Sequence, residues 1–279
     1  MADGTGLSGF AKTFPDRFFD VGIAEGHGVS MAAGMAAQGL LPVFAVYSTF
    51  LQRGYDMLIH DVALENLHVV LGVDRAGLGG ADGETHHGCF DPLFLPALPG
   101  YTVLCPASFA ELRHMLRQAL FELTGPVAVR YPRGGEGAWR GDASKEPLVR
   151  LREGRDVTLL TYGVLVNQTL AAAALLEERG VRAEVLKLNR IAPLDGAVLA
   201  GFFGETEILL VLEDCFGAGC VGQRITAILA GEGRAPRKLI LKNLGRTFAP
   251  EGGVPQLEER FGLDAAAVAA AAEEAFHER

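Results

Sequence analysis

Apolar and polar positions along the first half of the chain follow two alternating patterns. Short runs rich in Val, Leu and Phe have the length and near-continuous apolar character of buried strands. Longer segments between them place apolar residues three and four positions apart, as amphipathic helices do. We expect helices over residues 27–38, 51–65 and 109–123, and strands over residues 41–46, 67–73, 102–104 and 127–130. This alternation is typical of a parallel sheet that helices cover on both faces.

The pattern breaks at residues 134–146, where Gly and charged residues replace the apolar runs and indicate a linker. A second α/β unit is expected after it, with strands over residues 157–160, 183–188, 208–212 and 238–242 and helices over residues 165–179, 222–230 and 263–276. We therefore predict an α/β protein with two domains, residues 1–140 and residues 141–279.

The composition narrows the class of function. The chain has 279 residues, of which 49% are hydrophobic, and a formal charge of −9, which disfavours binding to nucleic acid or to an anionic membrane. No apolar stretch has transmembrane length, and the first residues lack the pattern of a signal peptide. The four cysteines form no Cys-x-x-Cys pair, as expected for reduced thiols. We expect a cytoplasmic protein that acts on small molecules.

A carboxylate stands where the first helix is expected to begin. Residues 20–24 are predicted to form a short apolar strand that leads into Glu25, and glycines at positions 22, 26 and 28 leave little side-chain bulk around it. Such a glutamate can simply favour the positive end of a helix. Alternatively, a carboxyl group in an apolar site can share a proton with a nitrogen atom of a ligand.

A second group of candidate residues lies where the strand over residues 41–46 passes into the next helix. The carboxyl ends of strands are the places at which open α/β sheets bind ligands. Tyr47 and Phe50 offer flat faces there, and Arg53 offers a positive charge. Ordinary core packing and a surface arginine are the alternative interpretation.

The densest polar segment covers residues 74–91, directly after the strand over residues 67–73. Loops at this position are normally short, so a long polar loop indicates function. Asp82, His86, His87 and Asp91 are all competent metal ligands, which leaves a metal site as the rival interpretation. Two adjacent histidine rings do not easily face one ion, which weighs against that interpretation.

Two arginines, Arg130 and Arg133, follow the strand over residues 127–130 on an irregular turn. Their guanidinium groups suit the recognition of phosphate or carboxylate, although a solvated charged turn would have the same sequence. Residues 217–222 match the G-x-G-x-x-G pattern of dinucleotide-binding proteins. No acidic residue follows the next strand, where a ribose would need one, so we interpret this match as a tight turn.

In order and spacing, these motifs resemble the 1-deoxy-D-xylulose-5-phosphate synthase family of transketolase-like thiamine-diphosphate enzymes. The segments that carry the resemblance are Phe14 to Glu25 with His27, Tyr47 to Arg53, Asp74 to Leu78 with Ala81, Asp82, Gly83, Thr85 and His86, and Val129 to Gly134. Residues 156–163 and 193–195 resemble, more loosely, a transketolase C-terminal domain. The resemblance implies a pyrimidine-binding parallel-sheet domain followed by a transketolase C-terminal-like domain.

The resemblance also implies a reaction. Pyruvate would lose CO2 on thiamine diphosphate, and the remaining two-carbon unit would join D-glyceraldehyde 3-phosphate on the route to isoprenoid precursors and thiamine. Glu25 matches the glutamate that bonds the aminopyrimidine ring and promotes its imino form. Phe50 matches the aromatic residue that stacks on that ring, and Tyr47 lies beside it on the substrate side.

The remaining matched residues belong to the substrate side. Arg53, Asp82 and His86 match residues that line the substrate and position the intermediate, and Asp82 and His86 with Glu25 form the expected catalytic set. Arg75 and Arg133 match the pair that holds the phosphate of the aldehyde.

The chain departs from the family in two ways. Gly26 stands where the family usually has Gln, and the Gly-Asp-Gly and Asn motif that binds Mg²⁺ and the diphosphate is missing from this sequence. The first residues read as a loop close to a buried element, as in a truncated or split gene. We therefore expect no metal ligands on this chain, an N-terminal diphosphate-binding chain or domain as partner, and a homodimer or heterotetramer. A subunit of another thiamine enzyme, such as a two-chain transketolase or a dehydrogenase, and a non-catalytic assembly subunit are the alternatives.

Overall fold

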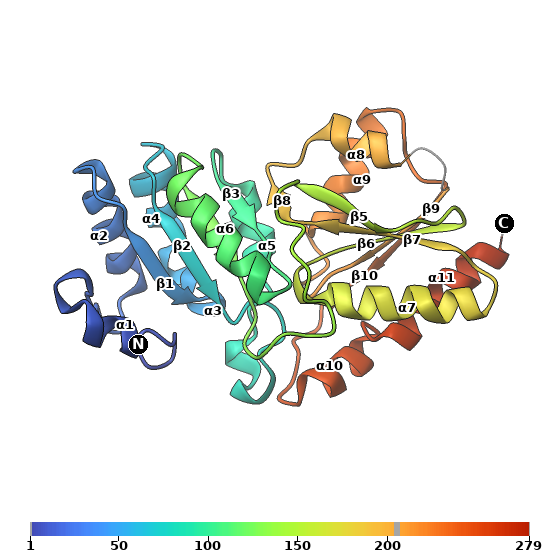
Figure 1. The fold of residues 1–279 in the computed structure, drawn as a ribbon, viewed down its shortest axis with the longest axis horizontal. Helices are drawn as coiled ribbons and strands as arrows, with labels where there is room; N and C mark the ends of the chain where they lie inside the picture. The colour runs from blue at the N-terminus through green and yellow to red at the C-terminus, as the bar shows by residue number, and fades with distance from the viewer. Residues whose placement is uncertain (1, 204–206, 279) are drawn as a thin grey trace.

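Two five-stranded sheets lie side by side in the computed structural model, which describes residues 2–203 and 207–278 (Figure 1). The strand orders are β1-β2-β4-β3-β8 in the first sheet and β10-β9-β6-β7-β5 in the second. Most neighbouring strands are parallel, and each sheet ends in one antiparallel strand, β8 or β5. The predicted fold class, two mostly parallel α/β layers, is confirmed.

The first sheet is built from the apolar runs of the first half. Its strands are β1 (Val43–Tyr47), β2 (Val70–Asp74), β4 (Val127–Arg130), β3 (Thr102–Leu104) and β8 (Arg190–Ala192). The in-register pairing of β1, β2 and β4 brings their carboxyl ends to one edge of the sheet. Every residue of β2 is buried, which explains why its sequence is almost entirely apolar.

The second sheet has the same construction. Its strands are β10 (Lys238–Lys242), β9 (Ile208–Leu212), β6 (Val157–Tyr162), β7 (Ala183–Leu188) and β5 (Leu148–Arg152). Four of its five strands, β6, β7, β9 and β10, lie where the apolar runs predict them.

Helices cover both faces of each sheet (Figure 1). In the first half, α2 shares an apolar cluster with Leu71 and Val73, whereas α6 shares another with Val70 on the opposite face, because successive strand residues point to opposite sides. In the second half, α7 and α11 cover one face, and α8 and α9 cover the other. The longer helices are α2 (Glu25–Ala37), α6 (Phe109–Phe121), α7 (Val166–Glu178), α9 (Val221–Gly231), α10 (Val254–Phe261) and α11 (Ala265–His277). The shorter helices are α1 (Ser8–Thr13), α3 (Ser48–Leu51), α4 (Tyr55–Met57), α5 (Asp91–Phe94) and α8 (Gly196–Phe202).

Two local predictions of the sequence are wrong. Residues 20–24 form no strand, and Ile23 is exposed, because no neighbouring strand pairs with this segment in the described chain. The helix expected over residues 51–65 is broken into α3, a 3₁₀ turn, α4 and a π-helix over Leu58–Ala63. Gly54 lies at this break, and a Cβ atom there would lie only 2.9 Å from Val29, so the absence of a side chain lets the segment pack closely on α2.

The sequence patterns also miss elements that depend on tertiary contacts. Strands β5 and β8, helix α8 and helix α10 were not expected. Strand β8 is short, and it comes from the second half of the chain but joins the first sheet through β3. The domain division near residue 140 remains a prediction. No helix in residues 2–203 and 207–278 is long and apolar enough to cross a membrane.

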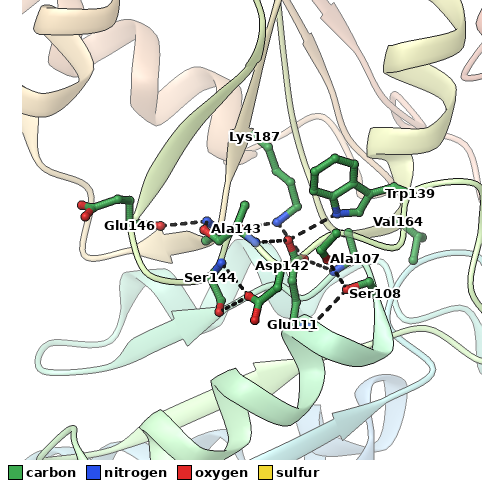
Figure 2. Close-up of polar contacts among 12 residues, drawn as sticks. Ala107, Ser108, Glu111, Trp139, Asp142, Ala143, Ser144, Glu146, Val164 and Lys187 are labelled. Atoms are coloured by element: carbon green, nitrogen blue, oxygen red, sulfur yellow. Dashed lines mark hydrogen bonds and ion pairs between the residues drawn. The ribbon is translucent and has the colours of Figure 1, made fainter.

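The segment over residues 134–146 has no helix or strand, as predicted, but buried charges fix it in place (Figure 2). Glu111 of α6 and Lys187 of β7 form a fully buried ion pair at 3.0 Å. The Glu111 carboxylate also accepts hydrogen bonds from the Trp139 indole N–H and from the backbone N–H groups of Ala143 and Ala107, at 3.3, 3.2 and 2.7 Å. One carboxylate therefore joins the first half, the linker and the second half.

Candidate active site

The candidate residues gather at the carboxyl edge of the first sheet. Tyr47 ends β1, Arg75 follows the last residue of β2, and Arg133 lies three positions beyond the end of β4. Because β1, β2 and β4 are neighbours in register, side chains from distant parts of the sequence meet here. Glu25 reaches the same region from the first turn of α2.

Aromatic and charged side chains are in contact on the α2 side of this edge. Arg53 lies 3.5 Å from a Glu25 carboxylate oxygen, and its guanidinium group is 5.9 Å from the centre of the Phe50 ring. The Phe50 ring stacks on Tyr47 at 5.7 Å and meets the edge of His86 at 5.3 Å. Glu25 is therefore connected through Arg53 to an aromatic surface.

The contacts continue into the polar loop after β2. The Arg75 guanidinium lies over the Tyr47 ring at 4.0 Å. Asp82 accepts a hydrogen bond from Nε of Arg75 at 3.4 Å and pairs with Arg133 through its other oxygen. Eight of the candidate residues thus form one continuous series of contacts, and we call them the site residues: Glu25, Tyr47, Phe50, Arg53, Arg75, Asp82, His86 and Arg133.

Arg75 is anchored by a residue to which the sequence assigned no role. Its backbone has a φ of +55°, a conformation that is uncommon outside glycine. Asp74 accepts from the Arg75 backbone N–H at 2.7 Å and from its Nη1 at 2.6 Å, and the carbonyl of Gly4 accepts from the same Nη1 at 2.8 Å. Burial raises the pKa of Asp74, and the nearby positive charge of Arg75 opposes that rise. An acidic residue at the end of a buried strand was the signal that could have indicated this role.

A cavity of about 460 Å³ opens beside the two phosphate-site candidates. Arg75, Arg133, Asp74, Tyr131 and Phe109 are among the residues that line it. Its volume is in the range of pockets that hold small molecules. The cavity therefore places a ligand-sized space next to the guanidinium groups.

Glycine at position 26 has a local structural consequence. A Cβ atom at this position would collide with the terminal methyl group of Met57, so the Met57 side chain occupies the space beside the Glu25 backbone. The thioether is flexible and apolar, and it keeps the region next to Glu25 closely packed. A larger residue at position 26 would require Met57 to move.

The possible metal ligands of the polar loop do not converge. Asp82 faces the arginines, while the buried Asp91 accepts from Ser48 at 2.8 Å and from Arg130 at 2.7 Å. His87 bonds to backbone groups. In the described part of the chain, no cluster of three or more His, Cys, Asp or Glu side chains is arranged to hold a metal ion.

The glycine-rich turn at residues 217–222 is also explained by internal contacts. The backbone N–H groups of Val221 and Gly222, at the start of α9, donate to the carboxylate of Glu213 at 2.9 and 3.0 Å. The positive end of this helix already has an anionic partner within the protein.

Two protein-family models match the chain. Residues 1–135 match the pyrimidine-binding domain of transketolase, and residues 147–268 match the transketolase C-terminal domain.

Curated relatives cover nearly the whole chain but are much longer. The chain is 45% identical over 276 residues to the 1-deoxy-D-xylulose-5-phosphate synthase of Chlorobium luteolum, which covers 96% of this chain and 43% of that protein. It is also 45% identical over 278 residues to 1-deoxy-D-xylulose-5-phosphate synthase 1 of Geobacter sulfurreducens, covering 98% of this chain and 44% of that protein. The chain therefore spans less than half the length of these relatives.

Solved structures show the same architecture. A split-gene transketolase described as an inactive β4 tetramer superposes with a TM-score of 0.86 and 28% identity, covering 99% of this chain and 90% of that one. A transketolase mutant from Pichia stipitis superposes with a TM-score of 0.75 and 17% identity, covering 91% and 37%, and supports the fold alone. The two family models and the 45% identity to the synthases show that the chain belongs to the transketolase family of thiamine-diphosphate-dependent transferases and carries its pyrimidine-binding and C-terminal domains.

Proposed function

We propose that this chain provides the pyrimidine and substrate side of a 1-deoxy-D-xylulose-5-phosphate synthase. The reaction would convert pyruvate and D-glyceraldehyde 3-phosphate to 1-deoxy-D-xylulose 5-phosphate and CO2. The observation that carries the proposal is the continuous series of contacts among the site residues, from Glu25 to Arg133. Residues from four separate segments meet in this series. Those proposed to bind the cofactor lie at one end of it, and those proposed to bind the phosphate of the substrate lie at the other.

The residues on the α2 side fit an aminopyrimidine ring. Phe50 is only partly buried and offers a flat apolar face, while Glu25 supplies a carboxyl group at the start of α2. When bound, thiamine diphosphate supplies the chemistry that removes CO2 from a 2-keto acid and transfers the remaining two-carbon unit. Glu25 would hold a proton at its carboxyl oxygen and share it with a ring nitrogen, and Tyr47 would support the Phe50 ring from behind.

The residues after β2 and β4 fit a phosphorylated aldehyde. Arg75 and Arg133 both line the cavity; the Arg133 side chain is 48% exposed, whereas that of Arg75 is 13% exposed and is paired with Asp74 and Asp82. Paired guanidinium donors are well suited to a phosphate group. Asp82 pairs with both arginines and His86 contacts Phe50, and from these positions the two residues would orient the reacting carbonyl groups.

The proposal includes a second polypeptide or domain. We assign the diphosphate and its Mg²⁺ to an N-terminal portion, as the resemblance implies, and the synthase relatives have room for one because this chain spans only 43% and 44% of their length. Assembly as a homodimer or a heterotetramer with that portion is part of the same proposal. Without it, the site residues would hold only one side of the cofactor.

Reconstitution tests the proposal. The chain is mixed with the N-terminal portion of the Geobacter relative, Mg²⁺, thiamine diphosphate, pyruvate and glyceraldehyde 3-phosphate, and product and CO2 are measured. We expect activity with the wild-type chain and its loss in Glu25→Gln, with circular dichroism showing that both chains are folded. Absence of product with the wild-type chain, or equal activity in the variant, would contradict the proposal.

A subunit of a two-chain transketolase is the second candidate. It is favoured by the split-gene transketolase, because this chain covers 90% of that structure and therefore matches a separate subunit in length. The same reconstituted protein distinguishes the two candidates. A transketolase would use a ketose phosphate as donor in place of pyruvate.

A further inference from the structure

The two adjacent histidines of the polar loop have different environments. His86 is partly exposed and contacts the rings of Phe50 and Tyr47. His87 is 7% exposed and points into the protein. The polar loop after β2 is closed at its base, because Gly77 and Gly88 each donate a backbone hydrogen bond to the other at 2.8 Å. His87 therefore lies at the base of a closed loop whose outer part carries Asp82 and His86.

The hydrogen bonds of His87 define its protonation. The backbone N–H of Gly79 points at Nδ1 of His87 at 2.9 Å, so Nδ1 must be the acceptor and carry no proton. Nε2 lies 3.0 Å from the carbonyl oxygen of Pro250, which can only accept, so Nε2 carries the proton and donates. The ring is therefore neutral, in the Nε2–H form, with both nitrogens bonded to backbone.

These bonds connect two parts of the chain that are far apart in sequence. Gly79 begins the loop that carries Asp82, and Pro250 lies between β10 and α10 in the second half. A Cβ atom on Gly80 would lie 3.2 Å from Val254, so α10 also approaches the loop closely. The second half contributes none of the site residues, but it contacts the loop that presents two of them.

We infer that His87 is a positioning residue for Asp82 and His86. Its ring accepts a hydrogen bond from Gly79 near the start of the loop and donates one to Pro250 of the second half. These two bonds fix the loop, so that Asp82 stays near the arginines and His86 stays near Phe50. His87 does not act on substrate itself, because both of its nitrogens are already bonded and its side chain is buried. The catalytic consequence rests on the proposed function, whereas the protonation state and the loop contacts do not.

The first experiment does not require the protein to be enzymatically active. In the isolated chain labelled with ¹⁵N-histidine, two-bond ¹H–¹⁵N correlations identify the form of each ring at neutral pH. We expect one histidine to show the neutral Nε2–H pattern, and its signals to disappear in His87→Asn. A His87 pattern of the Nδ1–H form or of the imidazolium would overturn the inference.

Two variants of His87 each remove one of its two hydrogen bonds and keep the other. Asn at position 87 keeps an acceptor near Gly79 and loses the donor to Pro250, whereas Gln keeps a donor toward Pro250 and loses the acceptor. Hydrogen exchange of the isolated chain should show faster exchange of the Gly79 amide in His87→Gln than in His87→Asn. Equal rates in the two variants would contradict the assigned contacts.

The reconstituted enzyme then tests the effect on the site. We expect both variants to lower kcat by about 10-fold to 100-fold, because small displacements of reacting groups have effects of this size, with little change in the KM for pyruvate. Unchanged kcat in variants that have lost the contact would overturn the positioning role. If the wild-type mixture is inactive, the proposed function fails, and the spectroscopic and exchange results still decide the contacts of His87.

Discussion

Charged side chains are arranged in opposite ways at the junction of the two halves and at the candidate site. At the junction, Glu111 and Lys187 are fully buried and bonded to each other (Figure 2). At the site, Arg53 is 61% exposed and Arg133 is 48% exposed, and their carboxylate partners belong to other site residues. Buried charges whose partners are all internal stabilise one arrangement of the chain, whereas half-exposed charges remain able to bind an outside group.

A second buried group extends this junction. Arg130 donates to Asp91 at 2.7 Å and lies 3.3 Å from Asp214 of the second half, while Asp91 also accepts from Ser48. Burial raises the pKa of Asp91, and the charge of Arg130 opposes that rise. Arg130 and Arg133 are only three residues apart, yet the first joins the two halves and the second faces the cavity.

Removing one partner at the junction should have the largest effect on stability. In Lys187→Met, the buried Glu111 carboxylate loses its only cationic neighbour among the described ion pairs, and the free energy of unfolding should fall by about 3–5 kcal/mol. Urea unfolding of the isolated chain measures the change.

The matched control for that variant is an exposed pair. Arg237 and Glu207 lie 3.0 Å apart on the surface, and Arg237→Met should change the free energy of unfolding by about 0–1 kcal/mol. If the two methionine variants lose the same stability, burial does not distinguish the junction from the surface.

A thiol in the same buried region gives an effect that depends on pH and is smaller for each pH unit. Burial raises the pKa of Cys105 from its ordinary value of 9.0 to about 12. The folded chain therefore keeps this proton while the unfolded chain loses it, so stability present below pH 9.0 is lost as the pH rises toward about 12. The loss contributed by this thiol should be about 1.4 kcal/mol per pH unit in that window.

Urea unfolding of wild type and Cys105→Ala at several pH values measures this contribution. The alanine variant should show a shallower decline above pH 9.0, because its unfolded chain has one thiol fewer to ionise. Identical pH dependence in the two proteins would show that this part of the junction is accessible to water.

The smallest effect on stability is expected at the site. Arg133→Met should change the free energy of unfolding by about 0–1 kcal/mol, because the arginine is half-exposed. In the reconstituted enzyme, the same variant should raise the KM for glyceraldehyde 3-phosphate by about 10-fold or more, as expected for a lost hydrogen bond to a charged group. Arg140→Met, at an exposed linker position, is the activity control. A large loss of stability in Arg133→Met, or an unchanged KM, would remove the contrast with the junction.

The strands of both cores could be predicted from sequence because burial on both faces leaves a strong apolar signal. Strands β3, β4, β7, β9 and β10 begin and end at the expected residues. The apolar pattern does not predict a strand correctly where pairing with a neighbouring strand determines whether the segment is a strand. Residues 20–24 are apolar enough for a strand but lack a pairing partner in the described chain, and Arg190 joins the first sheet because β3 lies beside it.

The residues of the candidate site were predicted from sequence, but the residues that hold them in place were not. The resemblance singled out the residues that the structure brings together, and their roles remain predictions. Asp74 and His87 lie in the polar segment over residues 74–91, but nothing in the order of its residues indicated which side chains they would hold. Hydrogen-bond partners such as Gly4 and Pro250 are 70 or more positions away from Arg75 and His87, so no local pattern records them.

The sequence by itself determined the order of the buried core strands and of most of the long helices between them, the family and the residue types available at the carboxyl edge of the first sheet. It did so because apolar periodicity and motif spacing are local properties of the chain. Only the tertiary structure decided which charges are internal and which remain open to a ligand, since burial and pairing depend on segments far apart in sequence. Arg130 and Arg133 illustrate that limit, because Arg130 at the end of β4 is buried while Arg133, three residues later, is half-exposed.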